Sequence, residues 1–277
     1  MEILEGKSVA NNIKKSFEER LNKLKIKPSI AVLGLKIDGA SDVYIRNIKK
    51  NCEIYGIKFN LVLSENAEEF KKNFEIVKKD ENITGIMFQQ PLEKGLCDLI
   101  NDIPENKDIE GIGINNMGKL FLGKKDALIP CTSKAVIETI DYYGIDLEGK
   151  KVVVVGRSNI VGKPLIPQLL NKNATVTICH SKTKNLNEEL KNADIIIMAI
   201  GKANFLKKEM IKKDAIVLDV GINVEEGKIV GDVDFNDIND YAKAATPVPG
   251  GIGVVTNAVL IDNIIKSAEL KKYLRIK

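Results

Sequence analysis

VVVVGRSNIVGKP, residues 152–164, is the stretch that decides the fold of the C-terminal half of this chain. A run of valines that stops at a glycine is typical of a strand buried on both faces of a parallel sheet, and a helical pattern follows it. Gly156 permits a sharp turn at the end of the strand, and Gly162 permits close packing of helix on sheet or close approach to a ligand. Such a turn points N–H groups at an anion, so it predicts a dinucleotide site. The spacing is not G-x-G-x-x-G, because Arg157 and Ser158 follow Gly156 directly.

The composition of the chain fits a globular protein and argues against several other classes. Its 277 residues are enough for one large or two medium domains, and 44% of them are hydrophobic. The net charge of +4 comes from scattered lysines, with no basic block that would indicate nucleic-acid binding. Four dispersed cysteines and a single histidine argue against a zinc site and fit reduced thiols. Neither a signal peptide nor a membrane-spanning run is visible, so we expect a cytoplasmic protein without a membrane partner.

Apolar runs alternate with helix-length segments along the whole chain. The expected strands are 29–35, 58–63 and 85–88 in the first half, and 151–155, 175–179, 195–199 and 216–220 in the second. The expected helices are 42–55, 67–79, 130–143 and 257–273. This alternation predicts βαβ units and an α/β fold. We place one domain at 1–142, to which the terminal helix 257–277 returns, and a Rossmann-like domain at 143–256.

The predicted second strand of the C-terminal half indicates which cofactor the turn would bind. It ends in Cys179-His180-Ser181-Lys182, without the carboxylate that binds the ribose hydroxyls of NAD. Hydroxyl and basic groups there, together with Arg157, favour the extra phosphate of NADP; the alternative is that Arg157 and Lys182 are merely exposed charges. His180 is the only histidine, and its position at the cofactor edge favours a structural or ribose-side role over that of a general base.

A second glycine-rich segment, TPVPGGIGVVT at 246–256, precedes the terminal helix. Two prolines and three glycines fix an extended backbone that a ligand can approach closely. An ordinary interdomain turn would have a similar composition, but the density of these residues favours a ligand-clamping loop. Asp219 ends an apolar strand just before Gly221, which suits a residue that orients a loop rather than a catalytic one.

Six segments together resemble one enzyme family. They are GRSNIVGKP at 156–164, TVTICHSKT at 175–183, DVGIN at 219–223, TPVPGGIG at 246–253, GIMFQQPL at 85–92 and KDIEGIGINNMGKL at 107–120. Over essentially its whole length the chain resembles the methylenetetrahydrofolate dehydrogenase/methenyltetrahydrofolate cyclohydrolase family. The resemblance implies a homodimer of two α/β domains flanking a cleft, with NADP in the C-terminal domain and tetrahydrofolate derivatives between the domains. A shikimate dehydrogenase-like enzyme of similar layout lacks support from the folate-side motifs.

The resemblance also implies which residues form the two sites. The substrate-binding positions are Ser41, Tyr44, Gln89, Glu110, Pro249, Gly250 and Gly251. The cofactor-binding positions are Gly156, Arg157, Ser158, Ile160, Val161, Gly162, His180, Ser181, Ala199, Gly201, Gly221, Ile222 and Thr256. The catalytic positions are Tyr44, Gln89 and position 48, and no metal is implied.

The catalytic helix departs from the family pattern Ser-x-x-Tyr-x-x-x-Lys. Ser41 and Tyr44 match, but the lysine position is Ile48. Lys49 and Lys50 point about 100° and 200° away from it on a helix. The position instead continues an apolar stripe at helical spacing, made of Ile45, Ile48, Cys52 and Tyr55. In addition, the folate-contacting aspartate of the family is replaced by Glu110, which keeps the carboxylate on a longer stem.

These departures bear on two reactions differently. Oxidation of methylenetetrahydrofolate by NADP depends mainly on positioning, so we expect it to survive as a step of one-carbon metabolism. Hydrolysis of the methenyl product to formyl-tetrahydrofolate needs proton transfer that isoleucine cannot perform, so we expect weak or absent cyclohydrolase activity. One alternative is a fully bifunctional enzyme that uses Lys49 or a water chain. Another is a non-catalytic folate- or nucleotide-binding homologue.

Overall fold

The computed structural model describes residues 1–35 and 39–274, without the side chains of 39–43 and 272–274. Backbone contacts divide the chain into two units. A six-stranded unit comprises Met1–Ile13, Phe121–Gly123 and Pro130–Val259, and a three-stranded unit comprises Lys14–Leu120, Lys124–Ile129 and Leu260–Lys277. The helices α1 (Gly6–Lys23) and α9 (Ile252–Leu274) each contribute residues to both units.

The six-stranded unit takes in segments that the predicted domain limits assign to the first domain, namely Met1–Ile13, Phe121–Gly123, 130–142 and 257–259. The N-terminal strand β1 (Glu2–Ile3) pairs in parallel with β11 (Ala244–Ala245), which brings the first residues into the six-stranded unit. Helix α5 (Cys131–Tyr142) packs on α6 (Gly162–Leu170), where Gln168 Nε2 donates to Ser133 Oγ at 3.0 Å. Neither contact has a signature in the local sequence.

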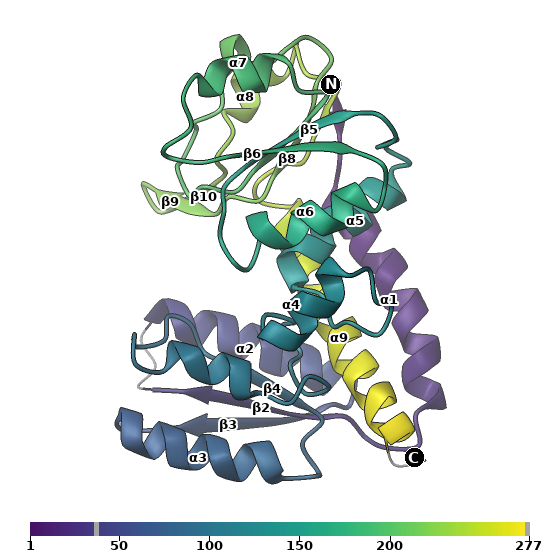
Figure 1. Cartoon of the computed structure of the whole chain (residues 1–277), viewed down its shortest axis with the longest axis vertical. Helices are drawn as coiled ribbons and strands as arrows, with labels where there is room; N and C mark the ends of the chain where they lie inside the picture. The colour runs from purple at the N-terminus through teal and green to yellow at the C-terminus, as the bar shows by residue number, and fades with distance from the viewer. Residues whose placement is uncertain (36–38, 275–277) are drawn as a thin grey trace. The chain divides into compact units, whose positions relative to one another are not determined.

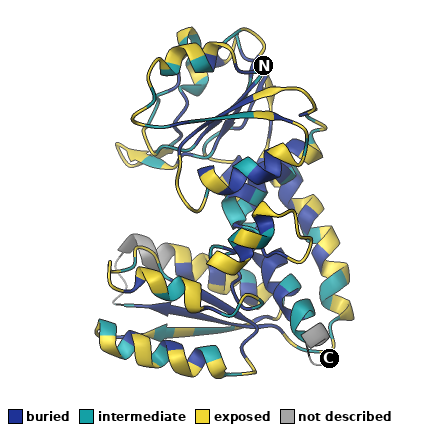
Figure 2. Cartoon of the chain, in the orientation of Figure 1, coloured by how far each residue is buried: buried dark blue, intermediate teal, exposed yellow. Residues whose placement is uncertain are grey.

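The six-stranded unit is built on a parallel sheet with the order β1-β11-β8-β7-β5-β6. Its four longer strands are β5 (Lys151–Val155), β6 (Thr175–Cys179), β7 (Ile195–Met198) and β8 (Ile216–Asp219), with β6 at one edge of the sheet. Helices α5 and α6 cover one face, and α7 (Leu186–Lys191) and α8 (Phe235–Ile238) cover the other (Figure 1). Valine and isoleucine side chains are therefore buried on both faces, as the sequence predicts for this kind of sheet (Figure 2).

The strand order reverses direction next to β5. The chain passes from β5 to β6 on one side and returns to β7 on the other side of β5. In open α/β sheets, such a switch point leaves a crevice at the carboxyl ends of the strands, and ligands bind there. Gly156 directly follows β5 and thus lies at this crevice.

The three-stranded unit has a parallel sheet with the order β3-β2-β4. The strands are β2 (Ser29–Gly34), β3 (Lys58–Leu63) and β4 (Gly85–Phe88), and helices α2 (Gly39–Ile54) and α3 (Ala67–Lys79) lie on opposite faces (Figure 1). Phe70 and Phe74 of α3 meet the ring of Phe88 edge-on at centroid distances of 5.2 and 5.1 Å. The segment around Asp108 bridges to Ile86, so it extends the sheet beyond β4.

Several elements lie outside the sequence prediction. They are β1, β11, α1, α4 (Ile114–Phe121), α7, α8, the short 3-10 turns η1 (Cys97–Asp102) and η2 (Lys208–Met210), and the hairpin of β9 (Asn223–Glu225) and β10 (Lys228–Val230). Helix α9 begins at Ile252, five residues before its predicted start, inside the glycine-rich segment. Within the described part of the chain, no helix combines the length and apolarity needed to span a membrane.

Candidate active site

The turn after β5 depends on two glycines. Gly156 has φ 131°, and a Cβ at this residue would lie 2.2 Å from the carbonyl oxygen of Ala199. A Cβ on Gly162 would lie 2.0 Å from the carbonyl oxygen of Gly156. Helix α6 therefore begins directly against the end of the strand. Of the two functions predicted for Gly162, close helix packing is the one that the geometry shows.

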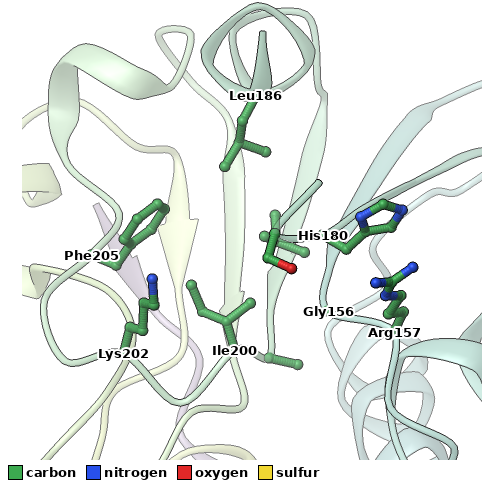
Figure 3. A pocket seen from close by; sticks show the side chains of 10 residues that line it. Gly156, Arg157, His180, Leu186, Ile200, Lys202 and Phe205 are labelled. Atoms are coloured by element: carbon green, nitrogen blue, oxygen red, sulfur yellow. The ribbon is translucent and has the colours of Figure 1, made fainter. Parts of the chain in front are cut away.

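A cavity of about 300 Å³ opens beside this turn. Its lining residues come from the carboxyl ends of β5, β6 and β7 and from the segments that follow: Val155, Gly156, Arg157, His180, Ser181, Leu186, Ala199, Ile200, Lys202 and Phe205. Arg157 and His180 lie on one side of the cavity, and Lys202 and Phe205 lie on the other (Figure 3). Among the described residues, this is the cavity where the predicted phosphate-side groups meet.

Five predicted cofactor residues line this cavity, namely Gly156, Arg157, His180, Ser181 and Ala199. Five lining residues were not predicted. Lys202 had a local signal, since it follows a strand end and Gly201. Leu186 and Phe205 had none, because the fold brings them to the cavity from outside any motif.

The other predicted cofactor positions belong to the same unit but are not among the lining residues. They are Ser158, Ile160, Val161, Gly162, Gly201, Gly221, Ile222 and Thr256. Ser158 Oγ accepts from the N–H of Val161 at 3.1 Å and so fixes the turn from within. Thr256 Oγ1 donates to the carbonyl of Ile252 inside α9. Ile222 is 65% exposed.

His180 is held by the turn that it forms. Its N–H donates to Thr183 Oγ1 at 2.8 Å, and its ring Nδ1 accepts from the N–H of Lys182 at 3.1 Å. The Nδ1 lone pair is thus used within the protein. This geometry agrees with the predicted structural or ribose-side role and not with a general base at Nδ1.

The loop from Thr246 to Gly251 is anchored at both ends. The N–H of Asp219 donates to Thr246 Oγ1 at 2.7 Å, and the N–H of Gly6 donates to the carbonyl of Gly250 at 2.8 Å. Gly251 is buried, and its carbonyl would lie 2.1 Å from a Cβ on Gly6. Of the three predicted substrate positions here, Pro249 and Gly250 are exposed, whereas Gly251 is a packing residue.

In the three-stranded unit, Ile48, which the resemblance places at the position of the family lysine, is part of the core. Ile48 is 1% exposed and lies on the buried face of α2 with Ile45 and Cys52. Burial raises the pKa of the Cys52 thiol to about 12. Tyr44, one turn before Ile48, is 40% exposed. The prediction for Ser41 falls outside the residues whose side chains the structure describes.

Gln89 leaves a buried acceptor without a donor. It follows β4, its N–H donates to the carbonyl of Leu33, and its side-chain Nε2 donates to the carbonyl of Gln90 at 2.9 Å. Its Oε1 is buried and accepts no hydrogen bond from any described residue. Such an orphan acceptor is rare and calls for an explanation.

Glu110 is a half-buried carboxyl group beside the end of β4. Burial, reinforced by the charge of Asp108, raises its pKa to about 8, although a hydrogen bond from the backbone N–H of Phe88 opposes the shift. Asp108 itself accepts from the N–H of Gly113 at 2.9 Å and from Asn116 Nδ2 at 3.0 Å. The two carboxyl groups thus differ: Asp108 is tied to its own loop, and Glu110 carries a proton at neutral pH.

In the described part of the chain, no group of three His, Cys, Asp or Glu side chains is arranged to hold a metal ion. The strand order, the switch point and the cavity define an α/β protein of the class that binds nucleotides at the carboxyl edge of a parallel sheet. The model of the tetrahydrofolate dehydrogenase/cyclohydrolase catalytic domain matches residues 4–110, and that of the NAD(P)-binding domain of the same family matches 130–272. The chain belongs to the tetrahydrofolate dehydrogenase/cyclohydrolase family.

Individual relatives agree with this assignment. A "Bifunctional protein FolD" from Campylobacter concisus is 45% identical over 280 residues, which cover 98% of this chain and 99% of the relative. The crystal structure of a bifunctional methylenetetrahydrofolate dehydrogenase/cyclohydrolase from Campylobacter jejuni is 40% identical, with a TM-score of 0.93 over 98% of this chain and 99% of that one. An enzyme from Trypanosoma brucei, solved with NADP and an inhibitor, is 27% identical with a TM-score of 0.88 over 99% of this chain and 98% of that one.

Proposed function

We propose that this protein oxidises methylenetetrahydrofolate to methenyltetrahydrofolate with NADP and hydrolyses the methenyl product weakly or not at all. The observation that carries the second half is Ile48, buried at the position of the family lysine. The first half is supported by family membership and by the glycine turn with its adjoining cavity.

The dehydrogenase reaction places few demands on acid–base groups. NADP supplies the hydride acceptor when it is bound, and the nitrogens of the folate stabilise the cation that forms. The chain has to hold the two reactants in line, which is the kind of positioning that rigid backbone provides. The Gly156 turn would hold the cofactor, and Tyr44, Gln89 and Glu110 would hold the pterin.

The cyclohydrolase reaction makes a different demand. Water adds to the methenyl carbon, and a proton must be moved before the ring opens. A positioned acid–base group typically contributes 10²–10⁴-fold to such a step. Ile48 has no proton to give. The Oε1 of Gln89 accepts no hydrogen bond from any described residue, so no donor is held there for the reaction. Both observations support a loss of hydrolysis.

NADP is favoured over NAD by the groups at the end of β6. Ser181 and Arg157 line the cavity, and no carboxylate is among its lining residues. A hydroxyl and a guanidinium are suitable ligands for the 2′-phosphate, whereas a carboxylate would repel it. The relative solved with NADP has the same fold. The homodimer implied by the family stays a prediction, which analytical ultracentrifugation would check.

The absorbance of methenyl-tetrahydrofolate separates the two activities. We expect it to appear when the enzyme is given methylenetetrahydrofolate and NADP, and to decay at nearly the buffer rate when enzyme is added to the methenyl compound alone. Rapid enzyme-dependent decay would identify the ordinary bifunctional enzyme, with Lys49 as the next residue to test. Binding of NADPH without any oxidation of the folate would identify a non-catalytic homologue.

Ile48→Lys is the companion test, with Ile45→Lys as a matched control. Both substitutions bury an ammonium group on the same face of α2, since Ile45 is 3% and Ile48 is 1% exposed. Only position 48 matches the family lysine. We expect hydrolysis to rise at least tenfold in Ile48→Lys and not in Ile45→Lys. Equal hydrolysis rates in Ile48→Lys and wild type, with dehydrogenase activity kept, would contradict the assignment of position 48.

A further inference from the structure

The wall of the cofactor cavity is built on a buried carboxylate that no motif singled out. The residues Ile200, Gly201 and Lys202 follow β7, and two of them line the cavity (Figure 3). Their three successive N–H groups converge on Asp232, at 2.7 and 3.1 Å from Oδ2 and at 2.8 Å from Oδ1. Asp232 has no exposed surface. Three successive N–H groups that converge in this way form a concavity that binds an anion, and here the protein fills it with its own carboxylate.

Asp232 also joins this loop to the next strand end. Its Oδ1 accepts from Asn223 Nδ2 at 3.0 Å, and Asn223 belongs to the segment that follows β8. Gly221 makes the approach possible, because a Cβ there would lie 2.2 Å from the carboxyl carbon of Asp232. One carboxylate thus sets the spacing between the loops after β7 and β8.

A second buried carboxylate holds the first. Asp219 Oδ1 accepts from the backbone N–H of Asp232 at 3.1 Å, and Oδ2 accepts from that of Val233 at 2.9 Å. Gly231 leaves room for it, since a Cβ there would lie 1.9 Å from Asp219 Oδ2. Asp219 also donates its own N–H to Thr246 at the start of the glycine-rich loop. The two aspartates, through their carboxylates and the N–H of Asp219, therefore connect four segments at the carboxyl edge of the sheet.

We infer that Asp232 is a positioning residue for the nicotinamide cofactor: it fixes the 200–202 wall of the cavity, and Asp219 fixes Asp232. The inference rests on the proposed cofactor site. Because Asp232 already occupies the N–H groups of 200–202, the pyrophosphate of the cofactor has to use the Gly156 turn instead. The wall is thus preorganised before the cofactor binds, which lowers the ordering cost of binding.

Asp232→Asn tests this directly. Each oxygen of Asp232 accepts two of the four bonds, so either orientation of the asparagine amide turns an NH₂ group toward two donors and breaks both bonds. We expect the Kd for NADPH, and the KM for NADP, to rise at least tenfold while kcat at saturating NADP changes less than threefold. The matched control is Asp234→Asn, which removes a carboxylate that caps α8 two residues away and has no bond to the 200–202 loop. We expect its Kd to equal that of the wild type.

A Kd within twofold of wild type in folded Asp232→Asn would overturn the inference. If this variant does not fold, hydrogen exchange of the wild type decides: the amides of 200–202 should be protected without cofactor, and exchange at the rate of an open loop would overturn it equally. Wild-type titrations with NADPH and NADH test the proposed function separately. Should only NADH bind, the comparison of the variants is made with NADH.

Discussion

The raised pKa of Glu110 makes the stability of the folate-free protein depend on pH in a specific way. An ordinary glutamate titrates near 4.5, and burial in the fold raises the pKa of Glu110 to about 8. Between these values the folded protein binds more protons than the unfolded chain, so the free energy of unfolding falls as pH rises through this window. Above pH 8 the free energy of unfolding falls no further on account of Glu110. At about 1.4 kcal/mol per pKa unit, the whole window corresponds to roughly 5 kcal/mol.

Glu110→Gln removes this titration while keeping the shape of the side chain. The free energy of unfolding of the variant should be closest to that of the wild type at pH 5, where Glu110 is protonated in the fold. The difference in free energy of unfolding between Glu110→Gln and wild type should increase by roughly 4 kcal/mol in favour of the variant between pH 5 and pH 9. Urea unfolding at both pH values measures this difference, in which other titrating groups cancel. Glu105→Gln is the control, because Glu105 lies exposed on the same segment.

A difference between Glu110→Gln and wild type that stays constant within about 1 kcal/mol from pH 5 to pH 9 would refute the reasoning. A confirmed window has a consequence for substrate binding. The pterin ring presents N–H donors. A charged carboxylate accepts hydrogen bonds from them more strongly than a protonated carboxyl group does. Folate binding at neutral pH would then release a proton, and the KM for the folate should fall as pH rises toward 8.

Two further substitutions test the fold and the cofactor site. Lys107 Nζ donates to the carbonyls of Lys78 and Asp80 at 2.9 Å each and so caps the end of α3. Lys107→Met should lower the free energy of unfolding in urea by about 2–3 kcal/mol, and a loss below 0.5 kcal/mol would show that water replaces the cap. Arg157→Ala should raise the KM for NADP about tenfold and leave the KM for NAD within twofold. An equal rise for both cofactors would argue against contact of Arg157 with the 2′-phosphate.

The parallel sheets were predictable because their strands are short apolar runs separated by helix-length segments, and the central strands β2, β4, β5, β7 and β8 are largely buried. The strands 58–63, 85–88, 151–155 and 175–179 have the bounds that the sequence predicts, and helix 67–79 does as well. The short pair of β1 and β11 was not predictable, since two residues show no periodicity and their partners lie at opposite ends of the chain. The start of α9 was placed too late because the glycine-rich composition of 250–253 concealed its first turn.

The site divides in the same way. Gly156 could be predicted because the backbone conformation of this turn favours glycine, which is visible in the sequence. Leu186 and Phe205 were not, since any apolar residue far along the chain would look the same. Asp232 is the clearest case: its neighbour Gly231 and the distant Gly221 are both required by buried carboxylates, but only the fold shows which carboxylate approaches which glycine.

The two halves of the proposed chemistry depend on different kinds of information. Hydride transfer depends on backbone positions, which are fixed by glycines and buried carboxylates in many places at once, so no single side chain carries it. Proton transfer, in this proposal, depends on one group at position 48. Isoleucine suits this position in the fold, because its side chain faces the core with Ile45 and Cys52. One substitution can therefore separate the two activities while leaving the fold and the cofactor site intact.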